Sequence, residues 1–218
     1  MDYAHFDTSV GERKTATAKF NRLHISKELQ NLRESAFRRS IPTADDETLS
    51  FLITQLRALQ PKRILELGTA TGISGIAMLE VCPGAHLTTV EKNEQFFEEA
   101  VNNFKCFKMN MRVNAICGDA GEQIDMLSGT FDFIFMDCAK VQYIKYLPRL
   151  KKLLARGGVL LADDILLFGW LTGEAEVPKK RKMLYEHVCE YVQAVTNDEE
   201  LSTTIINIGD GLAFSVKL

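Results

Sequence analysis

Three aspartates follow two apolar segments that have the pattern of buried strands. Asp137 closes the run 131–136, and Asp163 and Asp164 close the run 158–162. If these runs are adjacent parallel strands, their carboxyl ends bring the three carboxylates to one rim of a sheet. Clustered carboxylates repel one another unless they are protonated, paired or bound to a cation, and oxygen ligands suit Mg²⁺, Mn²⁺ or Ca²⁺ better than zinc. The alternative interpretation is that Asp164 caps the next segment and Asp137 only ends a strand.

A turn rich in small residues follows the first predicted strand. Residues 66–72 read Glu-Leu-Gly-Thr-Ala-Thr-Gly and lead into a predicted helix. Such a turn lets a ligand approach the backbone closely, and the start of the helix offers free N–H groups. The spacing is not GxGxxG, which disfavours a site for the pyrophosphate of NAD. Taken alone, the turn could equally be structural.

Acidic residues also end the next two predicted strands. Glu91 ends the second strand, where an acid in such folds accepts hydrogen bonds from ribose hydroxyls. Asp119 and Ala120 follow the third strand, where they could hold the edge of an adenine. Together with the turn, these residues indicate a nucleoside ligand at the carboxyl ends of the strands.

The segments that must position these residues alternate between strands and helices, which predicts βαβ units and a parallel sheet. Before the sheet, helical spacing predicts one helix over about 15–40 and another capped by Thr43. After it, a helix at 179–195 precedes two apolar segments that are joined by Gly209-Asp210-Gly211 and form a predicted antiparallel hairpin. The expected fold is α/β: a Rossmann-like, doubly wound, mostly parallel sheet that ends in an antiparallel hairpin, with N-terminal helices. The predicted strands are 63–67, 86–91, 112–116, 131–136, 158–162, 202–208 and 212–216.

Composition favours one domain over residues 1–218, with an N-terminal helical part at 1–60 and a Rossmann-like core at 61–218. The chain has 46% hydrophobic residues, and its net charge of −3 gives no general attraction to nucleic acid or membranes. Apolar runs are strand-sized, and residues 1–10 lack the features of a signal peptide. The five scattered cysteines form no CxxC motif. We therefore expect a cytoplasmic protein with free thiols and no membrane partner.

The string Glu-Leu-Gly-Thr-Ala-Thr-Gly-Ile-Ser at 66–74 resembles the cation-dependent class I S-adenosylmethionine O-methyltransferases of the catechol and caffeoyl-coenzyme A type. The resemblance runs from about Ile41 to the C-terminus, although Ala70 stands where many class I members have glycine. It implies that S-adenosylmethionine is the cofactor, with Glu66, Gly68 and Ser74 at its methionine end, Glu91 at the ribose, Asp119 and Ala120 at the adenine, and Ile41 and Asp137 beside the methyl donor.

The same resemblance implies a role for the aspartates as ligands of Mg²⁺, or of Mn²⁺ or Ca²⁺. Asp137 and Asp163 match the family pattern, but Asp164 stands where the family usually has asparagine, which adds a negative charge. Lys140 matches a lysine assigned as the base, so Lys140 and Asp137 are the candidate catalytic residues. A nearby cation should lower the pKa of such a lysine. The alternative for Lys140 is a surface lysine that begins a helix.

Two acceptors remain open at this stage. Residues 163–169, 177–181 and 209–213 resemble the bacterial branch that methylates 5-hydroxyuridine at the tRNA wobble position, and basic residues at 179–182, with Arg38 and Arg39, could meet the phosphates of a tRNA anticodon loop. A solvated basic face is the alternative for those residues. The second acceptor is a small phenol or catechol, with Phe168 and Trp170 as pocket walls. A catalytically silent nucleoside-binding module is a third interpretation, and by analogy with the family we expect a homodimer.

Overall fold

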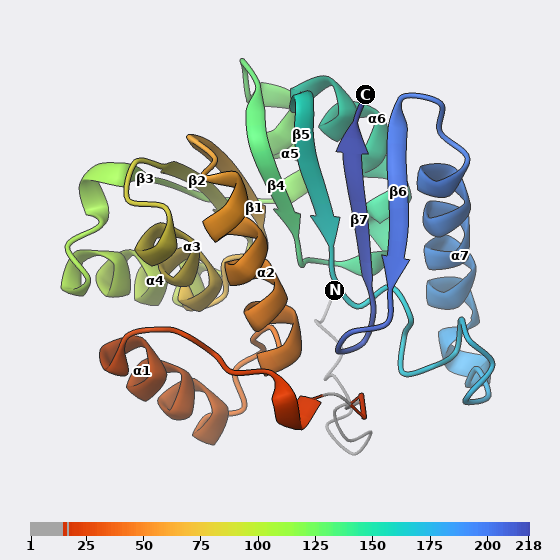
Figure 1. Ribbon diagram of the computed structural model, residues 1–218, viewed down its shortest axis with the longest axis horizontal. Coiled ribbons are helices and arrows are strands. Elements are labelled where there is room, and N and C mark those ends of the chain that lie inside the picture. The colour runs from red at the N-terminus through yellow and green to blue at the C-terminus, as the bar shows by residue number, and fades with distance from the viewer. Residues whose placement is uncertain (1–14, 17) are drawn as a thin grey trace.

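Seven strands form one sheet in the order β3-β2-β1-β4-β5-β7-β6 (Figure 1). Strands β1 to β5 are parallel, whereas β7 runs antiparallel to both β5 and β6. This confirms the predicted mostly parallel sheet with a terminal hairpin. The strands are β1 (Arg63–Leu67), β2 (His86–Glu91), β3 (Val113–Cys117), β4 (Phe131–Met136), β5 (Leu154–Ala162), β6 (Leu201–Ile206) and β7 (Leu212–Lys217).

Helices cover both faces of the sheet in this computed structural model, which describes residues 15, 16 and 18–218 (Figure 1). One apolar core lies between the sheet and helices α1 to α4, and the other lies between the sheet and α5 to α7. Neighbouring strand residues alternate between these cores, so the strands are apolar on both sides, as parallel strands covered by helices require. The helices are α1 (Lys27–Arg38), α2 (Asp46–Leu59), α3 (Ile73–Val81), α4 (Glu94–Cys106), α5 (Ala120–Met126), α6 (Tyr143–Leu153) and α7 (Lys182–Thr196), with short 3₁₀ turns η1 (Ala18–Phe20), η2 (Asn110–Arg112), η3 (Lys140–Gln142) and η4 (Lys179–Arg181).

The three central strands end at the same level. The register pairs Leu67 of β1 with Met136 of β4, and Met136 with Ala162 of β5. The next residues continue the ladder, because Asp137 N donates to Leu67 O at 2.9 Å and Asp163 N donates to Met136 O at 3.0 Å. The turn after β1 and the acids after β4 and β5 therefore share one rim, between the strands where the sheet order reverses.

The N-terminal helices differ from their predicted bounds. The single helix expected over 15–40 is replaced by η1 and, after an extended stretch, by α1, whose N-cap is Ser26. The second helix is capped by Asp45 rather than by the predicted Thr43, since the Asp45 side chain accepts a hydrogen bond from Thr48 N at 2.7 Å. Residues 41–45 lie outside any helix or strand, and α2 begins only at Asp46, which places Thr43 too early to reach the free N–H groups of α2.

Residues 1–14 and 17 lie outside the described part of the chain, and they include the segment 1–10 considered for a signal peptide. Within the described part, no helix combines the length and the apolar character needed to span a membrane. All five cysteines are described and all are free thiols, as expected.

Candidate active site

The turn after β1 is pressed against the end of β4. Gly68 has a φ of +96°, and a Cβ there would overlap the carbonyl oxygen of Asp137 and lie 2.8 Å from its carbonyl carbon. Gly68 N donates to Val90 O at 3.0 Å, which holds the same residue against β2. Glycine is therefore required at this position by the packing of the protein backbone itself.

Glu66 lies inside the fold beneath this turn. Its carboxylate is fully buried and accepts hydrogen bonds from Ser74 Oγ at 2.5 Å and from Thr89 Oγ1 at 2.6 Å. Burial raises the pKa of Glu66 to about 7, although the two hydroxyl donors act in the opposite direction. Glu66 thus holds Ser74 at the start of α3, and Ser74 is the partly exposed member of the pair.

The buried carboxyl of Glu66 predicts a loss of stability as the pH rises. A folded-state pKa of about 7, raised from the ordinary value of 4.5, gives stability that is fully present below about pH 4.5 and is lost as the pH rises to 7. The loss is on the order of 3 kcal/mol, because a tenfold change in the acid dissociation constant corresponds to about 1.4 kcal/mol. Glu66→Gln should remove this contribution, so its free energy of unfolding should fall less than that of the wild type between pH 5 and pH 8. Urea titrations at the two pH values measure the difference, and equal losses in both proteins would contradict the assignment.

Glu91 ties the turn to the end of β2. Its carboxylate accepts hydrogen bonds from Ala70 N at 2.8 Å and from Asn93 N at 2.7 Å. Ala70 adopts a left-handed φ of +43°, which places its N–H toward the acid. Thr71, next in the turn, has a buried hydroxyl without a hydrogen-bond partner in the described part of the chain. Glu91 retains acceptor capacity and Thr71 carries an unused hydroxyl, so the turn has the donors and acceptors that suit a nucleoside.

The other residues predicted to contact the cofactor are placed as follows. Asp119 caps α5 through Gly121 N at 2.9 Å and also pairs with Lys92 Nζ at 2.8 Å, a hydrogen bond that lowers the pKa of Asp119. Ala120 begins α5 and is partly buried. Ile41 is buried in the core that contains α1 to α4, and it begins the segment between α1 and α2. Their contact with a cofactor stays a prediction.

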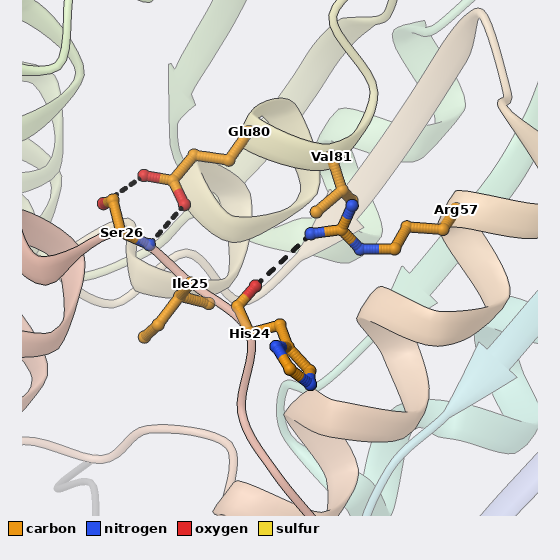
Figure 2. A pocket seen from close by; sticks show the side chains of 6 residues that line it. All are labelled: His24, Ile25, Ser26, Arg57, Glu80 and Val81. Atoms are coloured by element: carbon orange, nitrogen blue, oxygen red, sulfur yellow. Dashed lines mark hydrogen bonds between the residues drawn. The ribbon is translucent and has the colours of Figure 1, made fainter.

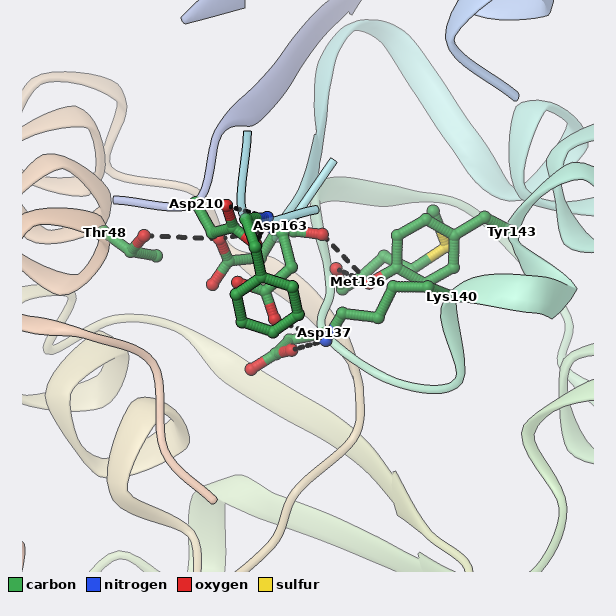
Figure 3. A network of polar contacts seen from close by, with 9 residues as sticks. Thr48, Met136, Asp137, Lys140, Tyr143, Asp163 and Asp210 are labelled. Atoms are coloured by element: carbon green, nitrogen blue, oxygen red, sulfur yellow. Dashed lines mark hydrogen bonds and ion pairs between the residues drawn. The ribbon is translucent and has the colours of Figure 1, made fainter. Parts of the chain in front are cut away.

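Lys140 contacts two of the three predicted metal ligands at the rim, and Figure 3 shows its side chain directed toward Asp137. Lys140 Nζ is 2.9 Å from Asp137 Oδ1 and 2.8 Å from Asp164 Oδ2, and its side chain is only 9% exposed. Asp163 lies deeper, and its Oδ1 accepts from Thr48 Oγ1 at 3.2 Å and from Asp164 N at 2.8 Å. Burial, together with the charges of Asp164 and Asp137, raises the pKa of Asp163 well above its usual value.

The arrangement of these side chains bears on both the metal and the base. Carboxylate oxygens suit a hard divalent cation, yet no group of three acidic, histidine or cysteine side chains in the described residues is arranged to hold one. Burial alone would lower the pKa of Lys140, but the Asp137 and Asp164 carboxylates outweigh it and raise this pKa well above the usual value. Lys140 therefore pairs with these two carboxylates as an ammonium group. The lowered pKa that the sequence predicts applies to this lysine beside a bound cation, and it stays a prediction. The metal site stays a prediction.

The turn between β6 and β7 holds the loop after β5 at this rim through Asp210, and we call these contacts the clamp. The sequence did not indicate them. Phe168 N donates to both carboxylate oxygens of Asp210, at 2.6 and 2.8 Å, and Leu166 N donates to Asp210 O at 2.8 Å. A Cβ on Gly211 would overlap the Leu166 side chain, and one on Gly209 would overlap the Asp45 carboxylate. The turn between β6 and β7 therefore holds both the loop after β5 and the start of α2. In the sequence, the Gly-Asp-Gly string predicted a hairpin and was part of the family resemblance, but neither indicated this contact.

The two aromatic residues proposed as pocket walls differ in exposure. The rings of Phe168 and Trp170 are 5.5 Å apart, but Trp170 is only 8% exposed and belongs to the core that contains α5 to α7. Phe168 is partly exposed and is the one of the two that can meet an acceptor.

An open surface hollow of about 490 Å³ lies elsewhere, lined by His24, Ile25, Ser26, Arg57, Glu80 and Val81 (Figure 2). Glu80 accepts hydrogen bonds from Ser26 N at 3.1 Å and from Ser26 Oγ at 2.5 Å. Arg57 and Glu80 lie near the ends of α2 and α3, which begin at the rim, so the hollow is distant from the rim along both helices. It contains none of the predicted site residues.

Comparison with known proteins identifies the family of this chain. A model of an O-methyltransferase family matches residues 19–218. The chain belongs to this O-methyltransferase family. A solved structure from Staphylococcus aureus, described as a candidate caffeoyl-CoA O-methyltransferase, is 31% identical, with a TM-score of 0.81 over 88% of this chain and 93% of that one. Tapetum-specific methyltransferase 1 of Arabidopsis thaliana is 29% identical over 87% of this O-methyltransferase and 86% of its own length. The S-adenosylhomocysteine-bound methyltransferase PaMTH1 of Podospora anserina shares the fold, with a TM-score of 0.83, 23% identity and 92% coverage of each chain.

Proposed function

We propose that this chain transfers the methyl group of S-adenosylmethionine to a hydroxyl oxygen at the carboxyl ends of β1, β4 and β5. The observation that carries the proposal is the shared rim, where the turn after β1 lies beside Asp137, Asp163 and Asp164. The match of residues 19–218 to the O-methyltransferase family supports it. A donor held by the turn and an acceptor held over the acids would lie next to each other, which is the proximity that methyl transfer needs.

We assign the following roles to the residues around the rim. Glu91 would bind the ribose, Asp119 and Ala120 the adenine, and Ser74, oriented by Glu66, the methionine end. The cofactor supplies an electrophilic methyl group on sulfur. As the methyl group leaves sulfur for the acceptor oxygen, the carboxylate of Asp137 would accept the proton of the hydroxyl, because Lys140, whose Nζ lies 2.9 Å from Asp137 Oδ1, is already an ammonium group.

For the acceptor, we favour 5-hydroxyuridine in a tRNA anticodon loop, which would become 5-methoxyuridine. The support is a basic row, Lys179 to Lys182, that follows the loop leading from Asp163 and Asp164. Lys179, Lys180 and Lys182 are exposed, where phosphate groups could reach them, and Lys182 Nζ also lies 3.6 Å from Glu186 Oε1. Arg38 is exposed as well, but Arg39 makes two hydrogen bonds to Glu99 at 2.6 and 2.7 Å, so its charge is already paired.

Removing the basic row should weaken RNA binding without changing the chemistry. The variant K179A/K180A/K182A should bind tRNA at least ten-fold less tightly, and the slope of log affinity against log salt should fall by up to about 3, one for each phosphate that is no longer neutralised. A matched variant, K62A/K152A/R156A, removes the same charge from exposed residues at the amino ends of β1 and β5. Filter binding across a salt series measures both. An equal weakening in the two variants would overturn the RNA surface.

A small phenol is the second candidate, and it is supported by relatives that are named caffeoyl-CoA O-methyltransferases, such as the protein of Stellaria longipes, which is 28% identical over 95% of this chain. The two acceptors separate in one assay, with S-adenosylmethionine, Mg²⁺ or Mn²⁺, and either bulk tRNA or catechol. Formation of 5-methoxyuridine, found by mass spectrometry of digested tRNA, supports the first candidate. A methylated catechol with unmodified tRNA supports the second. Assembly as a homodimer is a further proposal, which sedimentation in solution would test.

A further inference from the structure

Helix α4 holds two other segments of the chain on one of its sides. The two carboxylate oxygens of Glu99 accept hydrogen bonds from Arg39 Nη1 and Nη2, at 2.6 and 2.7 Å. One helical turn later, Asn103 Nδ2 donates to Thr71 O at 2.8 Å. Residues four apart lie on the same side of a helix, so α4 holds the end of α1 and the turn after β1 next to each other.

Apolar contacts support this arrangement. Ile41 and Ala100 belong to the core that contains α1 to α4, and Ala70 of the turn after β1 packs against that core. A Cβ on Gly72 would lie 3.4 Å from Ala100 Cβ, an ordinary contact distance, so the turn lies directly on α4. A cofactor held by this turn would therefore lie beside the segment 39–45, which connects α1 to α2.

The segment 39–45 is anchored near both of its ends. Ser40 adopts a left-handed φ of +53°, which ends α1, and Asp45 caps α2. At the first of these ends, the ion pair of Arg39 with Glu99 ties the segment to α4. The two side chains are 50% and 28% exposed, so the pair can separate without opening the buried core.

We propose that Arg39 and Glu99 are positioning residues that form a latch, and that this latch gates the passage of S-adenosylmethionine to and from the turn after β1. The inference rests on the proposed function, because it needs a cofactor at this turn. Two parallel hydrogen bonds between a guanidinium and a carboxylate hold their geometry better than a single surface contact does. The latch lies outside the predicted cofactor contacts, so it should set how fast the cofactor enters and leaves rather than how tightly it is bound.

The binding and release rates of radiolabelled S-adenosylmethionine test the latch. Glu99→Ala should raise both the association and the dissociation rate constants about five-fold and leave Kd within about two-fold of the wild type. Glu98→Ala removes the same charge from the adjacent, exposed residue and should leave both rates unchanged. Added salt should speed release from the wild type but not from E99A, because salt screens an exposed ion pair. A structural role alone would not give this difference in salt response.

Exchanging the two charges separates the latch from a general effect on folding. R39E places two acids together and should speed both rates more than E99A does. R39E/E99R should return both rates toward the wild-type values, because the ion pair forms again with its polarity reversed. Equal rates in E99A and the wild type, or the same increase in E98A, would overturn the latch while the proposed function stands. If the wild type binds no labelled cofactor, the proposed function fails, and the latch fails with it.

Discussion

Gly68→Ala is expected to cost this protein a large part of its stability. The new Cβ would overlap the Asp137 carbonyl oxygen, and neither strand can retreat. Asp137 N is bonded to Leu67 O, and Gly68 N to Val90 O, so the turn is held between β4 and β2. The clash adds to the strain of a φ of +96°. A loss of about 4 kcal/mol or more is expected, out of the roughly 5–15 kcal/mol that is typical of a domain.

Gly157→Ala is the matched control for this change. Gly157 also has a positive φ, +74°, but a Cβ there would meet nothing within 4 Å. Backbone strain alone should cost about 1 kcal/mol. Urea unfolding of the two variants separates the clash from the strain. If G68A were no less stable than G157A, the close approach of β1 to the end of β4 would be wrong.

Asp210→Ala should give the second largest effect, on turnover. The carboxylate holds Phe168 N, and the loop it anchors contains three left-handed residues outside glycine: Asp164, Leu167 and Phe168. Such a loop keeps its shape only while its anchors remain. We expect a loss of about 2–3 kcal/mol in stability from the unsatisfied buried N–H group, and a drop of about 100-fold in kcat, because a displacement of about 1 Å at a reacting group can cost that much.

Two variants make this result interpretable. Asp210→Asn keeps an oxygen that can accept from Phe168 N and should lose much less activity. Asp198→Ala breaks an ion pair with Lys151, 2.6 Å apart, just before β6 and should leave kcat unchanged. Hydrogen exchange over residues 164–170 should rise in D210A alone. Normal kcat in D210A would show that the clamp does not position the acceptor loop.

The rim itself was predictable from the sequence because it depends on strand ends. Alternating strands and helices define a parallel sheet, and the last apolar residue of a strand locates the acid that follows it. Asp137 and Asp163 were found in this way, and the register that aligns Leu67, Met136 and Ala162 confirms their common level. The bulge that extends β5 back to Leu154 was not predictable, since it depends on local pairing with Phe131.

The contacts around the rim were not predictable for a different reason. Thr48 and Asp163 are separated by 115 residues, and nothing local to either indicates the other. The position of Lys140 after β4 was known from the sequence. Whether its amino group is charged and paired with two acids, or neutral and able to act as a base, depends on side-chain geometry across two strands. The backbone of Asp137 gives a structural reason for glycine at position 68, and the contact of Gly68 with a cofactor stays a prediction.

Transfer of a labelled methyl group tests the central claim most directly. The purified chain would be supplied with S-adenosylmethionine that carries a deuterated methyl group, with Mg²⁺ or Mn²⁺, unfractionated tRNA and catechol together. We predict that mass spectrometry will find the label on a hydroxyl oxygen of one acceptor, with an equal amount of S-adenosylhomocysteine. A chain that binds the cofactor but places no label on oxygen in either fraction would contradict the claim.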